Sequence, residues 1–192
     1  MTSTTDFSTR FWRKFSVLRM LIVVLLSLAE AQAEGITVKS ANVDLVDDAY
    51  QLSANFDLGF TQTIEDAINR GLTMPFVVEF DISRRRTFLW DETIATETRP
   101  RQVSYNALTR QYRLSIGSLY QNFDRLQDVK QVLSSVRLDL ADRAALKKGV
   151  TYEIAIRMRL DVSRLPKPFQ VNALGSKEWN LPSDWYRFDF VP

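Results

Sequence analysis

The segment Leu146–Asp161, LKKGVTYEIAIRMRLD, carries the strongest fold signal in this sequence. From Tyr152 onward, apolar residues alternate with residues that are mostly charged, so each set points to its own face of an extended chain. This alternation predicts a β-strand over Tyr152–Asp161, with one face in the core and the other in solvent. Gly149 can supply a turn just before the strand.

Several other segments show the same alternation, and the strongest of them is Tyr50–Phe60. Together with weaker segments they predict about eight strands. These strands are Ile36–Val46, Tyr50–Phe60, Phe76–Ile82, Thr87–Ile94, Gln102–Tyr105, Tyr112–Ile116, Tyr152–Asp161 and Trp185–Val191.

Two helices are predicted between the strands. Thr63 can cap the first, with Asp66 reaching back to it, and Gly71 can end it. Its apolar face would carry Ile64, Ala67, Ile68 and Leu72. The second helix is predicted over Asn122–Ser135. Its apolar face would carry Leu126, Val129, Val132 and Leu133.

Leu146, Gly149 and Tyr152 form a pattern that resembles the L-x-P-G-x-x-Y stretch of fibronectin type III domains, with Lys148 in place of the proline. The resemblance implies a tyrosine corner, in which Tyr152 bonds back to backbone upstream. The alternative is an ordinary glycine turn before a strand whose first core residue is aromatic. Strand order and lengths favour a β-rich α+β fold, an immunoglobulin- or fibronectin-III-like β-sandwich of about eight strands with two inserted helices.

The first 33 residues have the organisation of a secretory signal peptide. A basic leader precedes the apolar run Met20–Leu28, and Ala31-Gln32-Ala33 is a cleavage pattern. The basic residues are Arg10, Arg13, Lys14 and Arg19. Because a spanning helix needs about 20 apolar residues, this run is too short to be one. We expect a signal peptide over residues 1–33 and a single periplasmic domain over residues 34–192, tethered to the inner membrane if the leader is not cleaved.

The composition excludes several classes of function. Residues 34–192 contain 21 basic and 21 acidic residues, and a neutral domain is a poor nucleic-acid binder. The chain has no cysteine and no histidine, which excludes disulfides, Ser-His-Asp catalysis and histidine-ligated metal sites. The calcium-loop pattern does not occur either. We therefore expect no cofactor, no metal ion and no catalytic residue.

A basic cluster, Arg84-Arg85-Arg86, follows one predicted strand, and Trp90 comes shortly after it. Three guanidinium groups can bind a phosphate, a lipid headgroup or an acidic partner through forked hydrogen bonds. The alternative is a charged hairpin end that keeps a sheet edge from pairing with other chains.

Four carboxylates offer an enzymatic alternative. They are Glu79, Asp81, Asp91 and Glu92. Glycoside hydrolysis needs two carboxyl groups about 5 to 10 Å apart, so a carboxylate-based hydrolase of envelope polysaccharide is the runner-up function. The competing prediction is cross-strand ion pairing of Glu79 and Asp81 with Arg157 and Arg159.

The C-terminal segment combines prolines with aromatic residues. Leu165–Phe169 contains Pro166 and Pro168 and cannot continue a central strand, because proline lacks an N–H donor. We expect it to leave the sheet as an extended segment. Trp179 and Trp185 flank a stretch with turn residues. These side chains either form a groove for a peptide or a glycan, or clamp a long crossover onto the core.

Six blocks of sequence stand out, in this order: Gly71–Pro75, Arg84–Asp91, Ser104–Tyr112, Arg159–Asp161, Leu165–Pro168 and Trp179–Trp185. Together they resemble the bacterial family catalogued as domain-of-unknown-function 4390. The resemblance covers essentially all of residues 34–192. It implies an exported, mostly proteobacterial envelope protein, and some members are encoded beside a membrane sensor kinase of the nitrogen-regulation type. It implies no activity, cofactor or catalytic residue.

The leading hypothesis is a non-enzymatic periplasmic binding or interaction module, with an envelope sensor kinase as its partner. The candidate interaction residues are Arg84, Arg85, Arg86, Trp90, Pro166, Pro168, Trp179 and Trp185. The third hypothesis, after the hydrolase, is a carrier of a lipid or apolar ligand. This function predicts a cavity between the sheets, and a close-packed core would contradict it.

Overall fold

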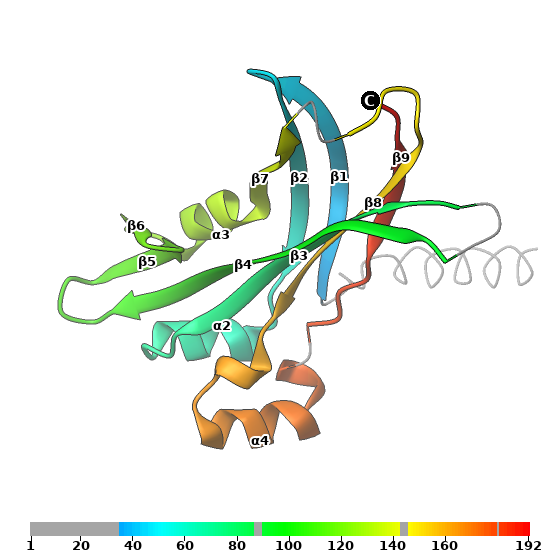
Figure 1. Cartoon of the computed structure of the whole chain (residues 1–192). Helices are drawn as coiled ribbons and strands as arrows, with labels where there is room; N and C mark the ends of the chain where they lie inside the picture. Colours follow the sequence, from blue (N-terminus) through cyan, green and yellow to red (C-terminus); the bar gives the residue numbers. More distant parts are fainter. Residues whose placement is uncertain (1–34, 87–89, 143–145, 180) are drawn as a thin grey trace, which may run out of the picture. The chain divides into compact units, whose positions relative to one another are not determined.

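The computed structural model describes residues 35–86, 90–142, 146–179 and 181–192, which form two antiparallel sheets with helices at their margins (Figure 1). The predicted signal peptide lies outside the described residues, as do Thr87, Phe88 and Leu89 of one predicted strand. The β-rich, two-sheet architecture expected from the sequence is confirmed.

The smaller sheet has three strands in the order β1-β2-β7. Their bounds are β1 Gly35–Val46, β2 Ala49–Gly59 and β7 Ser135–Asp142. Asp47 and Asp48 connect β1 to β2 with φ angles of 47° and 61°. Two successive positive φ values match the twist of a two-residue hairpin, and aspartate tolerates this conformation better than most residues.

The larger sheet has six strands in the order β6-β5-β4-β3-β8-β9. Their bounds are β3 Met74–Arg84, β4 Glu92–Asn106, β5 Gln111–Ile116, β6 Leu119–Phe123, β8 Tyr152–Leu160 and β9 Tyr186–Phe190. The central pair, β3 and β8, aligns Phe80 with Ile156 and Glu79 with Arg157.

Three predictions about the strands were wrong. Part of Thr87–Ile94 and all of Gln102–Tyr105 belong to one long strand, β4, rather than to two strands. Strands β6 and β7 were not predicted, and they lie on either side of the helix predicted over Asn122–Ser135. The helix that is present, α3, covers only Leu126–Ser134, with Val129 and Leu133 buried.

The first predicted helix is present as α2, Gln62–Asn69, but its cap is Thr61 instead of Thr63, and Leu72 lies beyond its end. The Thr61 Oγ1 atom accepts a hydrogen bond from the backbone N–H of Ile64 at 3.2 Å. Gly71 has a φ of +87°, and its N–H donates to the carbonyl of Ile68, so it ends the helix as predicted.

The core lies between the two sheets and is completed by α2 and α3. Strand β3 contributes Phe76 and Phe80, β8 contributes Ile154, and β2 contributes Leu52. These side chains belong to one buried hydrophobic cluster that draws residues from both sheets. Because the described inner-face side chains pack against one another, this part of the chain gives no support to the carrier alternative.

Tyr152 begins β8 and makes the contact that the sequence pattern implied. Its hydroxyl accepts a hydrogen bond from the backbone N–H of Lys147 at 3.0 Å, and its side chain is buried. A tyrosine that bonds back to the chain just upstream has the defining contact of a tyrosine corner.

Candidate functional site

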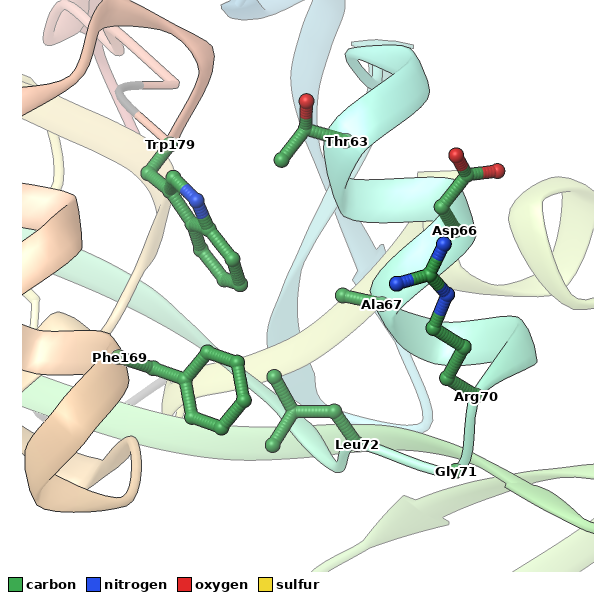
Figure 2. A pocket seen from close by; sticks show the side chains of 8 residues that line it. All are labelled: Thr63, Asp66, Ala67, Arg70, Gly71, Leu72, Phe169 and Trp179. Carbon is green, nitrogen blue, oxygen red and sulfur yellow. The ribbon is translucent and has the colours of Figure 1, made fainter.

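A groove of about 580 Å³ lies between α2 and the C-terminal segment that contains α4, Lys167–Gly175, and the 3-10 helix η2, Lys177–Trp179 (Figure 2). Its volume is within the range of sites that hold small ligands or several side chains of a partner. Eight residues line it: Thr63, Asp66, Ala67, Arg70, Gly71, Leu72, Phe169 and Trp179.

One wall of the groove is aromatic. The rings of Phe169 and Trp179 lie with their centroids 5.6 Å apart at an angle of 47°. Leu72 and Ala67 lie across from them and supply an aliphatic surface (Figure 2). The groove is therefore apolar between its two walls, which suits an aliphatic or aromatic group.

Two threonines of the α2 N-terminus hold the aromatic wall in place. Thr61 is buried, and its hydroxyl donates to the backbone carbonyl of Glu178 at 2.6 Å. The hydroxyl of Thr63 donates to the Glu178 carboxylate at 3.0 Å. Because Glu178 directly precedes Trp179, these bonds fix the indole relative to α2.

The rim of the groove carries charge. Asp66 accepts a hydrogen bond from Gln62 Nε2 at 2.8 Å. The exposed Arg70 guanidinium makes no hydrogen bond or ion pair with any residue that the structure describes. The groove thus joins an apolar interior to an available cation, an arrangement that can bind an apolar group next to an anionic one.

A family model described as "Domain of unknown function (DUF4390)" matches residues 33–189. The chain belongs to the DUF4390 family. The match confirms the resemblance inferred from the six sequence blocks, and it spans both sheets and both walls of the groove. No curated protein and no solved structure matches this DUF4390 chain. Among the residues described, no helix has the length and apolar character to cross a membrane.

The prolines of the DUF4390 chain are placed differently from the prediction. Pro166 and Pro168 lie at the start of helix α4, where an extended segment was expected. Proline is tolerated in the first turn of a helix, because the N–H groups there have no partner within the helix. The prediction that Leu165–Phe169 leaves the sheet is confirmed. This helical turn brings Phe169 to the groove.

The two tryptophans of the tail lie in different places. Trp179 is only 8% exposed, so it clamps the crossover onto the core while one part of its ring lines the groove. The ring of Trp185 lies near two arginines, with the Arg157 Cζ atom 4.4 Å and the Arg187 Cζ atom 6.0 Å from its centre. Trp185 does not line the groove.

The basic cluster of the DUF4390 chain is engaged in ion pairs. Arg84 and Arg86 both pair with Glu92, and Arg85 pairs with Glu153. The hydrogen bond from Arg86 is the main cause of a lowered pKa of Glu92. Burial opposes this effect, and the bond from Arg84 and the charges of both arginines add to the lowering. Paired charges of this kind fit the hairpin-end alternative.

Trp90, after that cluster, is 93% exposed. The structure does not bring Trp90 or the three arginines to the groove. A binding role for these four residues stays a prediction.

Glu79 lies on the outer face of β3 and forms the predicted ion pairs. Its carboxylate accepts hydrogen bonds from Arg157 Nε at 2.6 Å and from Arg159 Nη2 at 2.7 Å. Burial acts to raise the pKa of Glu79, but the bonds and charges of Arg159 and Arg157 outweigh it, so the pKa is lowered. A carboxyl held ionised in this way is poorly suited to be the proton donor of a hydrolase.

The other half of the ion-pair prediction was wrong. Asp81 forms no ion pair with Arg157 or Arg159, and its Oδ1 atom is buried without a hydrogen-bond partner among the residues described.

The polar rim of the groove was missed by the sequence analysis. The sequence pattern indicates a helix cap at Thr63 and Asp66 and gives no role to Arg70. The i,i+4 spacing of Asp66 and Arg70 just before Gly71 places both at the exposed end of one helix face, and this is the signal that could have indicated them.

Proposed function

We propose that this DUF4390 protein is an exported, periplasmic interaction module without catalytic activity, and that its groove binds a segment of an envelope membrane protein. The observation that carries the proposal is the groove itself, in which the aromatic wall of Phe169 and Trp179 faces Leu72. At its rim the Arg70 guanidinium has no partner among the residues that the structure describes. The tyrosine corner at Tyr152 supports an immunoglobulin- or fibronectin-III-like interpretation of the sandwich.

The groove suits a short peptide segment with one apolar anchor. Binding energy at protein interfaces concentrates in a few large side chains that enter well-packed pockets. An apolar side chain between Trp179 and Leu72 would be removed from water, and an acidic neighbour could pair with Arg70. The expected partner sequence is therefore an apolar residue adjacent to an aspartate or glutamate.

The proposed partner is the periplasmic part of a membrane sensor kinase. Its support is the family resemblance, since some members are encoded beside such a kinase. The leader sequence supports the location, because a protein exported to the periplasm meets only the periplasmic parts of inner-membrane proteins.

The groove can be tested by capture of partners from detergent-solubilised membranes with the protein obtained from the full-length chain. Arg70→Glu reverses the rim charge at an exposed position and should leave the fold intact. We expect it to reduce capture of the partner by about tenfold, as loss of a charge-assisted contact does. Arg70→Lys keeps the charge and should retain most of the binding.

The matched control is Lys148→Glu, which makes the same change of charge at an exposed turn residue. If Arg70→Glu and Lys148→Glu capture the same amount as the wild type, the groove does not bind the partner. Circular dichroism of each variant separates loss of binding from loss of folding.

Export is tested independently by mass spectrometry of the protein from fractionated cells. We expect a soluble periplasmic species that begins at Glu34. An intact Met1 in the membrane fraction would show that the leader is kept as an anchor.

A further inference from the structure

Strand β6 is an exposed edge of the six-stranded sheet. It lies at the end of the strand order, next to β5 (Figure 1). Leu119 is 76% exposed and Tyr120 is 64% exposed, and both are large apolar or aromatic residues. An edge with such side chains offers a template for pairing with another strand.

The other three edge strands carry charges that oppose such pairing, whereas β6 carries none. Its sequence, Leu119–Phe123, has no charged residue and no proline. The charged side chains of the other edges include Lys39 in β1, Arg137 in β7 and Arg187 in β9. Since charge is the usual protection of an edge, β6 is the edge most suited to accept a strand.

The turn before β6 determines which of its backbone groups are free. Gly117 and Ser118 form a two-residue turn, in which Gly117 has a φ of +60°. Such a turn closes on a hydrogen-bonded pair, here Ile116 and Leu119. Hydrogen-bonded and non-hydrogen-bonded pairs then alternate, so Tyr120 and Asn122 direct their N–H and C=O groups away from β5.

We propose that β6 pairs antiparallel with β6 of a second copy of this chain, with the two-fold axis at Gln121. In this register Tyr120 lies opposite Asn122 of the second copy. The free N–H and C=O groups of these two residues then form four hydrogen bonds across the axis. A register shifted by one residue would place inward-facing groups at the junction, and a register shifted by two would pair only one of the two outward-facing residues within β6. The axis at Gln121 therefore gives the most hydrogen bonds.

The same register covers the exposed apolar side chains. Leu119 lies opposite Phe123 of the second copy, on the face of the sheet that carries Ile116 and Tyr112. Phe123 and Tyr112 are partly buried against the core, so Leu119 extends an apolar row that already exists. No two like charges meet, because every residue of the paired strands is uncharged.

The dimer is tested by analytical ultracentrifugation of the protein obtained from the full-length chain, at low ionic strength. The wild type should show a monomer–dimer equilibrium in the micromolar range, because a junction of this length buries less than the roughly 1,600 Å² of a standard interface. Gln121→Lys and Gln121→Glu each place like charges opposite each other at the axis and should weaken the dimer by about tenfold or more. An equimolar mixture of the two variants should restore it.

The control is Gln102→Lys, which adds the same charge at an exposed position of β4 away from the edge and should leave the dimer unchanged. A wild type that stays monomeric throughout the micromolar range would overturn the proposal. So would Gln121 variants that associate as strongly as the wild type, or a mixture that associates no better than its components.

Discussion

The hydroxyl of Tyr152 accepts a hydrogen bond from the backbone N–H of Lys147, and thereby ties the start of β8 to the turn that precedes it. The turn is also closed by a bond from the N–H of Val150 to the carbonyl of Lys147 at 3.3 Å. The Tyr152 side chain therefore bonds the N–H of Lys147, and the Val150 backbone bonds its carbonyl. Because Tyr152 is buried at the end of the central strand pair, this contact fixes where β8 enters the sheet.

Tyr152→Phe should lower the free energy of unfolding by about 1 to 2 kcal/mol, because the Lys147 N–H loses its acceptor in a partly buried place. Urea unfolding followed by circular dichroism measures this difference. Tyr50→Phe is the matched control, since Tyr50 is also buried but its hydroxyl has no hydrogen bond to a described residue. Equal effects of the two substitutions would mean that the Tyr152–Lys147 bond contributes nothing specific.

The ion pairs of Glu79 should make stability depend on pH. At neutral pH, Glu79→Gln should lower the free energy of unfolding by about 1 to 2 kcal/mol, because it removes a hydrogen-bonded charge. The loss is limited because both arginines are partly exposed to solvent. The pKa of Glu79 is lower in the folded chain than its unfolded value of 4.5. The stabilisation is therefore complete above that value and is lost as the pH falls through the folded pKa.

Urea midpoints measured from neutral to acidic pH for the wild type and Glu79→Gln test this dependence. The difference between the two proteins should be constant above about pH 4.5 and should shrink below it. Glu97→Gln is the control, because the Glu97–Arg99 pair is exposed and should contribute no more than about 1 kcal/mol. A difference that grows on acidification would contradict the assignment.

Thr61 and Thr63, at the N-terminus of α2, should contribute unequally to the free energy of unfolding. Thr61→Val removes the helix cap and the bond to the Glu178 carbonyl from a buried site, and should cost about 2 to 3 kcal/mol. Thr63→Val removes only the contact with the exposed Glu178 carboxylate and should cost less than about 1 kcal/mol. Thermal or urea unfolding compares them, and the reverse order would show that Thr63 is the cap.

Arg101 should be dispensable for stability. It is 5% exposed, its Nε atom has no partner among the described residues, and burial lowers its pKa. Arg101→Met keeps the aliphatic part of the side chain and removes the buried charge. It should leave the free energy of unfolding unchanged or raise it by up to about 2 kcal/mol. A loss of more than about 1 kcal/mol in urea unfolding would reveal a partner for the guanidinium group.

Elements with a strong local pattern could be predicted from the sequence. β2 alternates over its whole length, and β8 does so except at Ala155. The pairing of Glu79 with Arg157 and Arg159 follows from that alternation. β6 could not be predicted in the same way. Its first four residues are all exposed, so no alternation between core and solvent marks it as a strand.

The groove was only partly predictable, because it depends on contacts between distant parts of the chain. The sequence indicated that Trp179 and the residues around Pro166 matter, since prolines and aromatics stand out locally. It did not indicate that Phe169 and Trp179 face α2. That arrangement is set by the bonds from Thr61 and Thr63 to Glu178, which join residues more than a hundred positions apart.

This separation along the chain has a consequence for when the groove can first form. The Leu72 side of the groove belongs to one segment, but the opposite wall comes from Phe169 and Trp179, about a hundred residues later in the sequence. A chain interrupted before Lys167 would have α2 but no Glu178 for Thr61 and Thr63 to hold. The groove can therefore form only after the chain has been synthesised through Trp179 and this segment has folded back against α2.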